Sequence, residues 1–297
     1  MARTRRLLDN YGPGKIGLSF ELFPPKTPEG ETDLFQNLRE LVAFGPSFIT
    51  CTYGAGGSTR DKTLDIAGRV KREFGLPVAS HLTCVGATAD DLRQYLREAR
   101  DRDIDYIVAL RGDPPKGEEA FRVTEGGYAY ACELVGLLRA EFPEFDVAVA
   151  GYPEMHPEAV SLDADIDNLK RKIDCGADIV ITQLFYSNAR FLEFRDRCAG
   201  AGINAPIVPG LLPVTNLTQV KRITSMCGAH LPEEFQARLE ASEGQPQEQF
   251  EIGVEHASRQ VEELVREGTP GVHFYVLNKS RAAARILGQM SLPESAR

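Results

Sequence analysis

The chain has 297 residues and a formal net charge of −9, with a single basic cluster of three arginines at residues 3–6. This acidic balance lacks the positive surface of a nucleic-acid-binding protein, so we expect no nucleic-acid partner. No apolar run approaches the ~20 residues of a membrane span, and the short one after the first arginines ends at Asp9, so we expect neither a membrane segment nor a signal peptide.

Eight short apolar runs recur along the chain, and each is predicted to form a β-strand. In chain order they are residues 18–21, 48–54, 77–84, 106–113, 146–156, 178–185, 206–213 and 271–279. Helices are predicted at 31–44, 59–74, 88–101, 126–140, 162–174, 188–200, 215–227, 248–267 and 280–288. Alternating strands and helices are typical of parallel βαβ units, and eight strands favour closure. We therefore predict an α/β fold: one (β/α)8 TIM barrel domain over residues 1–297, with an extra helical excursion at 230–247 before the eighth strand.

Nearly every apolar run ends in polar or ionisable residues. In a parallel barrel the carboxyl ends of all strands open on one side, so these dispersed groups are expected to converge in one pocket. The pattern therefore predicts a catalytic face.

Glu21 lies in the segment SFELFPPK, where alternation places Ser19 and Glu21 on one side of the strand and Phe20 and Leu22 on the other. A partly desolvated carboxyl at the barrel mouth would keep its proton more readily near neutral pH, which suits a proton donor. An ion pair at the strand end is the alternative interpretation.

The loops after the second and fourth strands are also candidate site segments. Small residues in TYGAGGSTRD (52–61) would let the backbone approach a ligand, although the segment is neither GxGxxG nor a Walker A motif. RGDPP places Arg111 and Asp113 directly after the fourth strand, before prolines that stiffen the loop. A flexible loop and a solvent-exposed turn, respectively, are the alternatives.

The segment YPEMHPEA (152–159) precedes a helix on which Asp165, Asn168, Arg171 and Lys172 share roughly one face. That array could grip sugar hydroxyls and phosphates, or it could be a plain solvated face. The amide of Gln183 suits the edge of a heterocycle, or it could pair with loop backbone. His81 and His156 likewise could be structural histidines.

The six cysteines are at positions 51, 84, 132, 175, 198 and 227, without CxxC or other metal-ligand spacing. We therefore expect no metal and predict buried, reduced thiols, which fit a cytoplasmic protein.

Taken in order, SFELFPPK, TYGAGGSTRD, HLTC, ALRGDPP, YPEMHPEA, the D-x-x-N-x-x-RK helix, ITQLFY, PGLLPVTN and HFYVLNK resemble the bacterial-type methylenetetrahydrofolate reductases over almost the entire chain. The resemblance implies a flavoprotein oxidoreductase of one-carbon metabolism that reduces 5,10-methylenetetrahydrofolate to 5-methyltetrahydrofolate. It implies NADH or NADPH as donor, noncovalent FAD, and a ping-pong reaction with hydride passing through flavin N5. We also expect a homo-oligomer without control by adenosylmethionine.

Carried over position by position, the resemblance makes Glu21 the general acid and Asp113 the carboxylate beside the flavin and the pterin. Further folate contacts are implied for Gln183, Gln219 and Lys279. The implied flavin-binding set is Thr52, Tyr53, His81, Arg111, Gly112, Asp113, Tyr130, Ala131, Tyr152, His156, Ala159, Asp165, Asn168, Arg171 and Lys172.

Two positions depart from the family pattern. Ile223 stands where some relatives have an aromatic ring for stacking on the nicotinamide donor, and Lys279 stands where arginine can occur. Lysine keeps the charge but not the bidentate geometry for a carboxylate of the folate tail.

Two other functions fit the residues without the resemblance. One is a flavin-free barrel, such as an aldolase or another pterin enzyme, and the other is a non-catalytic barrel that acts as a subunit or binding module. A bound-flavin absorption spectrum would distinguish them from the flavoprotein.

Overall fold

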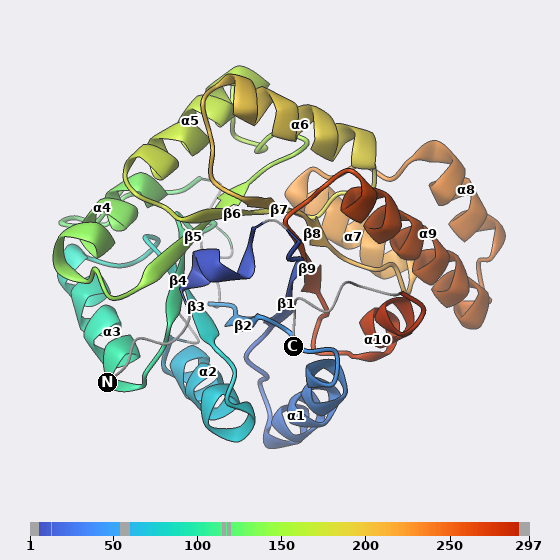
Figure 1. The fold of residues 1–297 in the computed structure, drawn as a ribbon, viewed down its shortest axis with the longest axis horizontal. Coiled ribbons are helices and arrows are strands. Elements are labelled where there is room, and N and C mark those ends of the chain that lie inside the picture. The colour runs from blue at the N-terminus through green and yellow to red at the C-terminus, as the bar shows by residue number, and fades with distance from the viewer. Residues whose placement is uncertain (1–5, 13, 54–59, 115–116, 118–119, 291–297) are drawn as a thin grey trace.

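Parallel strands close into a barrel with helices around it (Figure 1). The computed structural model describes residues 6–12, 14–53, 60–114, 117 and 120–290. Its strands are β1 Gly17–Leu22, β2 Phe48–Cys51, β3 Val78–Thr83, β4 Tyr106–Leu110, β5 Asp146–Gly151, β6 Ile179–Thr182, β7 Ile207–Val208, β8 Gly210–Leu211 and β9 Gly271–Tyr275. They pair in the order β7-β6-β5-β4-β3-β2-β1-β9-β8. This sheet confirms the (β/α)8 barrel predicted from the sequence.

The seventh barrel strand is divided at Pro209 into β7 and β8. β7 pairs with β6, whereas β8 pairs with β9, so the two halves close the barrel between them. Proline has no N–H to give to a strand ladder, but the Pro209 carbonyl still accepts a hydrogen bond from His273 N at 2.9 Å. The predicted run 206–213 is therefore a barrel strand, interrupted where its proline falls.

The helices connect the strands and lie outside them. They are α1 Pro28–Val42, α2 Arg60–Phe74, α3 Ala89–Asp101, α4 Ala131–Glu141, α5 Leu162–Asp174, α6 Asn188–Gly200, α7 Leu217–Cys227, α8 Glu233–Ala241, α9 Pro246–Arg266 and α10 Arg281–Gly288. Side chains of Thr27, Thr88, Ser161 and Asn216 accept hydrogen bonds from backbone N–H groups in the first turns of α1, α3, α5 and α7. These caps fix helix starts on the side where the strands end.

The predicted helix over 126–140 begins five residues later than expected, at Ala131. Gly126 has a φ of +72°, which does not continue a right-handed helix, and Glu133 accepts hydrogen bonds from Ala129 N and Tyr130 N instead. The excursion at 230–247 is confirmed as helical: it contains α8, which packs beside α9 on the outside of the barrel (Figure 1).

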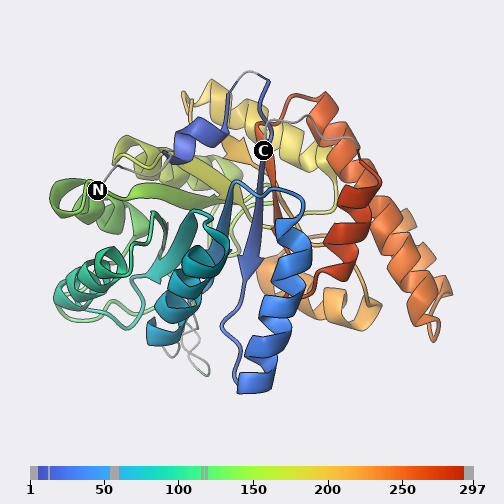
Figure 2. The ribbon, with the colours of Figure 1, turned by 60° about the horizontal axis from the view of Figure 1, so that its bottom comes forward.

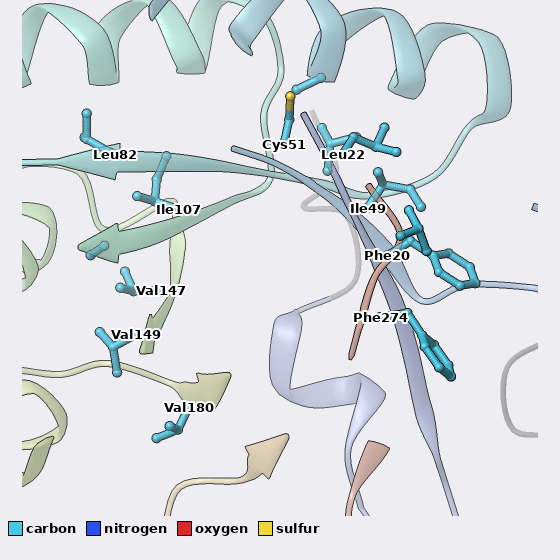
Figure 3. Close-up of a cluster of buried hydrophobic side chains, with 14 of the residues drawn as sticks. Phe20, Leu22, Ile49, Cys51, Leu82, Ile107, Val147, Val149, Val180 and Phe274 are labelled. Atoms are coloured by element: carbon cyan, nitrogen blue, oxygen red, sulfur yellow. The ribbon is translucent and has the colours of Figure 1, made fainter. Parts of the chain in front are cut away.

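The two faces of the strands have different neighbours. Outward side chains join the helices in a large apolar cluster, shown in Figure 3 for Phe20, Leu22, Ile49, Cys51, Leu82, Ile107, Val147, Val149, Val180 and Phe274. Burying a side chain of this size stabilises the fold by roughly 1.5–3 kcal/mol. Alternation along each strand then directs the intervening residues toward the barrel interior.

A short 3-10 helix, η1 Leu7–Asn10, was not predicted, and it closes one end of the barrel (Figure 2). Leu7 is fully buried in a cluster with Phe48, Tyr106 and Val208, which face inward at the amino ends of their strands. Leu7 N donates to Asp146 Oδ2 at 2.7 Å. Because this end is closed, access to the interior is from the carboxyl ends of the strands.

Candidate active site

Glu21 is the buried carboxyl of the barrel interior, near the end of β1, with 6% of its surface exposed. Its Oε2 lies 3.4 Å from His81 Nε2 on β3 and 3.9 Å from His273 Nε2 on β9. Burial lowers the pKa of His81, and His273 adds to this effect whereas Glu21 opposes it. At neutral pH the His81 ring is therefore uncharged, and the structure brings together Glu21 and His81, which the sequence predicted as separate site residues.

The strand β9 adds two further side chains around Glu21. His273 Nδ1 lies 2.8 Å from Ser19 Oγ, and the Tyr275 hydroxyl donates to the Thr182 carbonyl at 2.7 Å. Burial raises the pKa of Tyr275 well above its usual value, and the nearby Glu21 carboxyl adds to this effect. Tyr275 thus remains a neutral hydroxyl, engaged with backbone.

The loop after β4 is held by Arg111, which binds Glu158 with both terminal nitrogens, at 2.6 and 2.8 Å. This ion pair lowers the pKa of Glu158. Gly112 has a φ of +90°, and a Cβ there would lie 2.6 Å from Val85 Cγ1. Asp113 follows and is exposed. The loop therefore needs glycine at its turn and presents the Asp113 carboxylate outward, while Pro115 lies outside the described residues.

Tyr152 and His156 pack edge to face after β5, with ring centroids 4.7 Å apart. His156 Nδ1 accepts a hydrogen bond from Glu158 N at 3.1 Å, and its backbone N donates to Asp165 Oδ2 at 2.9 Å. Burial lowers the pKa of His156, and Arg111 lowers it further. The uncharged ring therefore carries its proton on Nε2, where it can serve a ligand.

Polar side chains of α5 extend this surface. Lys172 Nζ donates to the Ala150 carbonyl at 2.6 Å, and burial lowers the pKa of Lys172 to about 8. Arg171 donates to Asn168 Oδ1 at 3.2 Å, and both side chains are exposed. Burial raises the pKa of Asp165. Asp165 and Lys172 are thus hydrogen-bonded to the backbone of β5 or of the loop after it. Asn168 and Arg171 remain on the surface.

The remaining predicted flavin residues lie around the ends of β2 and β3 and the start of α4. Thr52 is buried, and Tyr53 packs edge to face on Tyr95 with centroids 5.6 Å apart. Tyr130 is 63% exposed and immediately precedes Ala131, the first residue of α4. Ala159 is half-buried in the β5 loop. The glycine-rich part of TYGAGGSTRD, residues 54–59, lies outside the described residues.

The predicted folate residues are more dispersed. Gln183 lines a shallow depression with Tyr152 and Met155, and its Oε1 accepts from the next backbone N–H, that of Leu184, at 2.9 Å. The amide oxygen of Gln183 is therefore paired with loop backbone, as the alternative interpretation of this residue expected. Gln219 lines a second depression together with Ile223 and Leu277. Lys279 is exposed, two residues beyond Leu277.

Sequence reasoning missed Ser19, His273, Tyr275 and Glu158 as site residues. For β9 a signal existed: Val272 and Phe274 belong to the outward cluster, so His273 and Tyr275 between them must face the interior. Nothing in the sequence indicates that Glu158 pairs with Arg111, which lies 47 residues earlier.

The cysteines are all free, but they are not all buried as predicted. Cys51, Cys84 and Cys198 are buried, Cys132 and Cys227 are half-buried, and Cys175 is exposed at the end of α5.

Among the described residues, no three or more His, Cys, Asp or Glu side chains form a group suited to a metal ion. Within those same ranges, no helix combines the length and apolar character needed to cross a bilayer.

Comparison with known proteins agrees with the resemblance. The family profile of methylenetetrahydrofolate reductase matches residues 4–291. The chain is 42% identical to 5,10-methylenetetrahydrofolate reductase of Salmonella typhimurium and 41% identical to that of Escherichia coli, covering 92% of this chain and 90% of each relative. It is 38% identical to methylenetetrahydrofolate reductase (NADH) 1 of Zea mays, over 100% of this chain and 52% of the maize protein. The chain thus spans about half the length of the plant relatives.

Among solved structures, an uncharacterized protein from Clostridium thermocellum that binds two copies of 5-methyl-5,6,7,8-tetrahydrofolic acid superposes with a TM-score of 0.62. The two share 15% identity, and the match covers 94% of each chain. This likeness supports the barrel fold alone. The profile over nearly all of the sequence and the bacterial relatives at about 40% identity show the ancestry directly. The chain belongs to the methylenetetrahydrofolate reductase family.

Proposed function

We propose that this protein is an FAD-dependent enzyme that reduces 5,10-methylenetetrahydrofolate to 5-methyltetrahydrofolate with NADH or NADPH as donor. The observation that carries the proposal is the buried carboxyl of Glu21 near the end of β1, which has one oxygen facing two histidine rings. A buried acid beside an uncharged His81 is suited to giving one proton to a basic nitrogen. Membership of the methylenetetrahydrofolate reductase family indicates which nitrogen would receive this proton: the folate nitrogen that leaves when the methylene bridge opens.

The residues around the carboxyl ends of β3, β4 and β5 fit a flavin dinucleotide. Thr83 Oγ1 is buried without a hydrogen-bond partner among the described residues, and it lies against Gly112, where a Cβ would be 3.0 Å from Thr83 Cβ. His156 offers Nε2–H, while Asn168 and Arg171 are exposed on α5. Such a set suits a ligand that joins a neutral heterocycle to a diphosphate, because it combines neutral donors with cations.

FAD bound there would supply the hydride carrier, accepting hydride from the nicotinamide at N5 and giving it to the folate in a second half-reaction. Tyr130, Tyr152, His156 and Lys172 would hold it.

Glu21 would act on the folate. The bridging carbon of 5,10-methylenetetrahydrofolate becomes an acceptor for hydride only after the five-membered ring opens, and opening requires a proton on the departing nitrogen. The barrel wall around Glu21 excludes bulk water from that proton, since Ser19, Thr50 and His273 are each at most 1% exposed. Asp113, in the loop after β4, would place a negative charge that stabilises the resulting cationic iminium.

The test begins with the purified protein. Acid extraction and chromatography should identify FAD, and anaerobic assays with NADH or NADPH plus 5,10-methylenetetrahydrofolate should yield 5-methyltetrahydrofolate. FMN in place of FAD would contradict the cofactor assignment. A colourless protein that takes up no flavin on reconstitution and forms no product would contradict the reductase and favour a flavin-free barrel.

A further inference from the structure

We propose that Ser19 and His273 form a buried pair that positions the carboxyl of Glu21 and leaves one of its oxygens for the substrate. The proposal deepens the function proposed above, because orientation of this carboxyl matters for catalysis only if Glu21 is the proton donor. Neither Ser19 nor His273 belongs to the site that the sequence predicted.

Strand register places the pair directly behind Glu21. In the parallel pairing of β1 with β9, Ser19 is opposite His273 and Glu21 is opposite Tyr275. Ser19 and His273 therefore form one layer of the barrel interior, and Glu21 and Tyr275 form the next layer toward the strand ends. Ser19 and His273 are each 1% exposed, so solvent does not compete for their hydrogen bonds.

The hydrogen-bonding needs of the two side chains select one arrangement. Ser19 Oγ lies 2.8 Å from His273 Nδ1, and either atom can be the donor. If the serine hydroxyl donates, Nδ1 is the acceptor and the neutral ring carries its proton on Nε2, facing Glu21 Oε2 at 3.9 Å. If Nδ1 donated instead, Nε2 would turn a lone pair toward the ionised carboxyl. The first arrangement therefore gives the serine hydroxyl an acceptor and turns the Nε2 hydrogen toward the Glu21 carboxylate.

Both histidines address the same oxygen of Glu21. His81 Nε2 lies 3.4 Å from Oε2, and His273 Nε2 approaches that oxygen from the layer below. Among the described residues, the titratable groups that face or interact electrostatically with Glu21 include His81 from β3, Cys51 from β2, and His273 and Tyr275 from β9. The Tyr275 hydroxyl is already engaged with the Thr182 carbonyl. Both imidazole edges therefore face Oε2, and the proposal leaves Oε1 for a substrate nitrogen.

Serine, histidine and glutamate are also the components of a hydrolytic triad, but burial excludes that role here. A nucleophilic hydroxyl must reach substrate, whereas Ser19 is 1% exposed in the layer behind Glu21. Ser19 and His273 are therefore positioning residues that act through Glu21.

Two substitutions of His273 test the roles of its two ring nitrogens separately. The amide of asparagine reaches about as far as Nδ1, so His273→Asn keeps a partner for Ser19 but withdraws the group facing Glu21. The longer side chain of His273→Gln reaches about as far as Nε2. We expect folate reduction to fall about a hundredfold in His273→Asn, the usual cost of a misplaced catalytic group, and to recover to within about tenfold of wild type in His273→Gln.

Reduction of the holoenzyme flavin by the nicotinamide donor should change less than about threefold in both variants, because that half-reaction needs no proton from Glu21. Losing the donor to Oε2 disfavours the ionised carboxyl, so the alkaline limb of folate reduction should move to higher pH in His273→Asn. Unchanged folate kinetics in His273→Asn would overturn the proposal. Parallel loss of both half-reactions in both variants would assign His273 to folding or flavin binding.

A second measurement does not depend on activity. Two-bond 1H–15N spectra of protein labelled with 15N-histidine report which nitrogen of each ring is protonated, and the signal missing from His273→Gln identifies His273 among the five histidines. We expect the Nε2–H form in wild type and loss of that preference in Ser19→Ala. An Nδ1–H form in wild type overturns the pair. If the Nε2–H form is found but wild-type protein does not reduce the folate, the proposed function fails and the pair stands.

Discussion

Glu21 lies near the end of β1 and Asp113 lies in the loop after β4, and the chain surrounds these two carboxyl groups differently. Glu21 is 6% exposed and faces two imidazole edges, whereas Asp113 is exposed in a loop whose turn requires Gly112. Two tyrosines interact with these carboxyl groups. Tyr275 interacts electrostatically with Glu21 and with Tyr152, and Tyr152 in turn interacts with Asp113. The buried acid is suited to hold a proton and the exposed one to place a charge.

Replacing Glu21 with glutamine tests the first role. Glu21→Gln keeps size and hydrogen bonding but cannot release a proton, so folate reduction should fall roughly 10²–10⁴-fold, the usual range for a lost general acid. Flavin reduction by NADH or NADPH, followed anaerobically by stopped flow, should stay within about tenfold of wild type, or ~1.4 kcal/mol. Collapse of both half-reactions would mean that Glu21 holds the fold or the flavin. No change in either would place the acid elsewhere.

Asp113→Asn tests the second role. Removing a negative charge beside the flavin should raise its midpoint potential and slow folate reduction more than flavin reduction, since the charge favours both hydride donation and the iminium cation. Asp167→Asn, at an exposed position on α5, is the matched control and should leave the potential unchanged. If potential and folate kinetics both match wild type, Asp113 is a structural turn residue.

At the level of elements, the divided seventh strand makes the barrel closure depend on one small residue. Gly210 begins β8 opposite His273 in β9, and its N donates to Thr182 Oγ1 at 2.9 Å. A Cβ at Gly210 would overlap the Thr182 carbonyl oxygen and lie 2.7 Å from Tyr275 Cε2. The space that a side chain would occupy is filled by the tyrosine next to Glu21.

Gly210→Ala should therefore destabilise the protein by roughly 1–3 kcal/mol, the usual cost of overpacking, in equilibrium denaturant unfolding. The matched control is Gly136→Ala on α4, where a Cβ would meet nothing within 4 Å. That change should be neutral or stabilising by up to about 1 kcal/mol, because alanine restricts the unfolded chain. Equal effects of the two substitutions would show that the closure tolerates a methyl group.

The elements differ in how far local sequence determines them. Apolar runs such as residues 18–21 and 271–279 predicted strands because this signal is local. The helix predicted over 88–101 likewise begins at a local cap, formed by Thr88 and Asp91. η1 has four residues, too few for any periodicity, and it is held by contacts with strands far along the chain. The late start of α4 depends on the conformation of Gly126, which periodicity does not report.

For the whole molecule, buried histidines make stability depend on pH. Burial lowers the pKa of His81, His156 and His256 from their ordinary value of 6.5. The unfolded chain then binds more protons than the folded one just below that value, so this contribution is complete above about pH 6.5 and is lost as the pH falls. Asp165 acts in the opposite sense nearer pH 4, because its pKa is raised from 3.8.

His256 provides the cleanest test because it lies away from the candidate site, stacked on Phe235 of α8 at 3.8 Å. The free energy of unfolding, measured by urea between about pH 7.5 and 5.5, should fall with pH less steeply in His256→Gln than in wild type. One histidine contributes at most about 1.4 kcal/mol per pH unit. Parallel slopes in wild type and His256→Gln would contradict the assignment.

The site was predictable to the extent that it follows from the barrel. Residues at the ends of separate strands converge because parallel strands end together, so Glu21, His81, Arg111 and Tyr152 could be named in advance. The pairs they form could not, because the Arg111–Glu158 and Ser19–His273 contacts depend on strand register and loop shape rather than on spacing. The cysteines show the same limit, since nothing local indicates that Cys175 is exposed.

The pairing of β1 with β9 joins two strands that are far apart in the sequence, and this affects the order of folding. Ser19 and His273 are 254 residues apart, and Leu7 and Asp146 are 139 apart. Strands β2 to β6 each have a partner made just before or after them, whereas β1 lacks one of its two neighbours until residue 271 has been synthesised. Contacts this distant form slowly, because a long loop must close before they are gained. On the ribosome, β1 is thus synthesised long before it is enclosed, and Glu21 meets His273 only after β9 has been made.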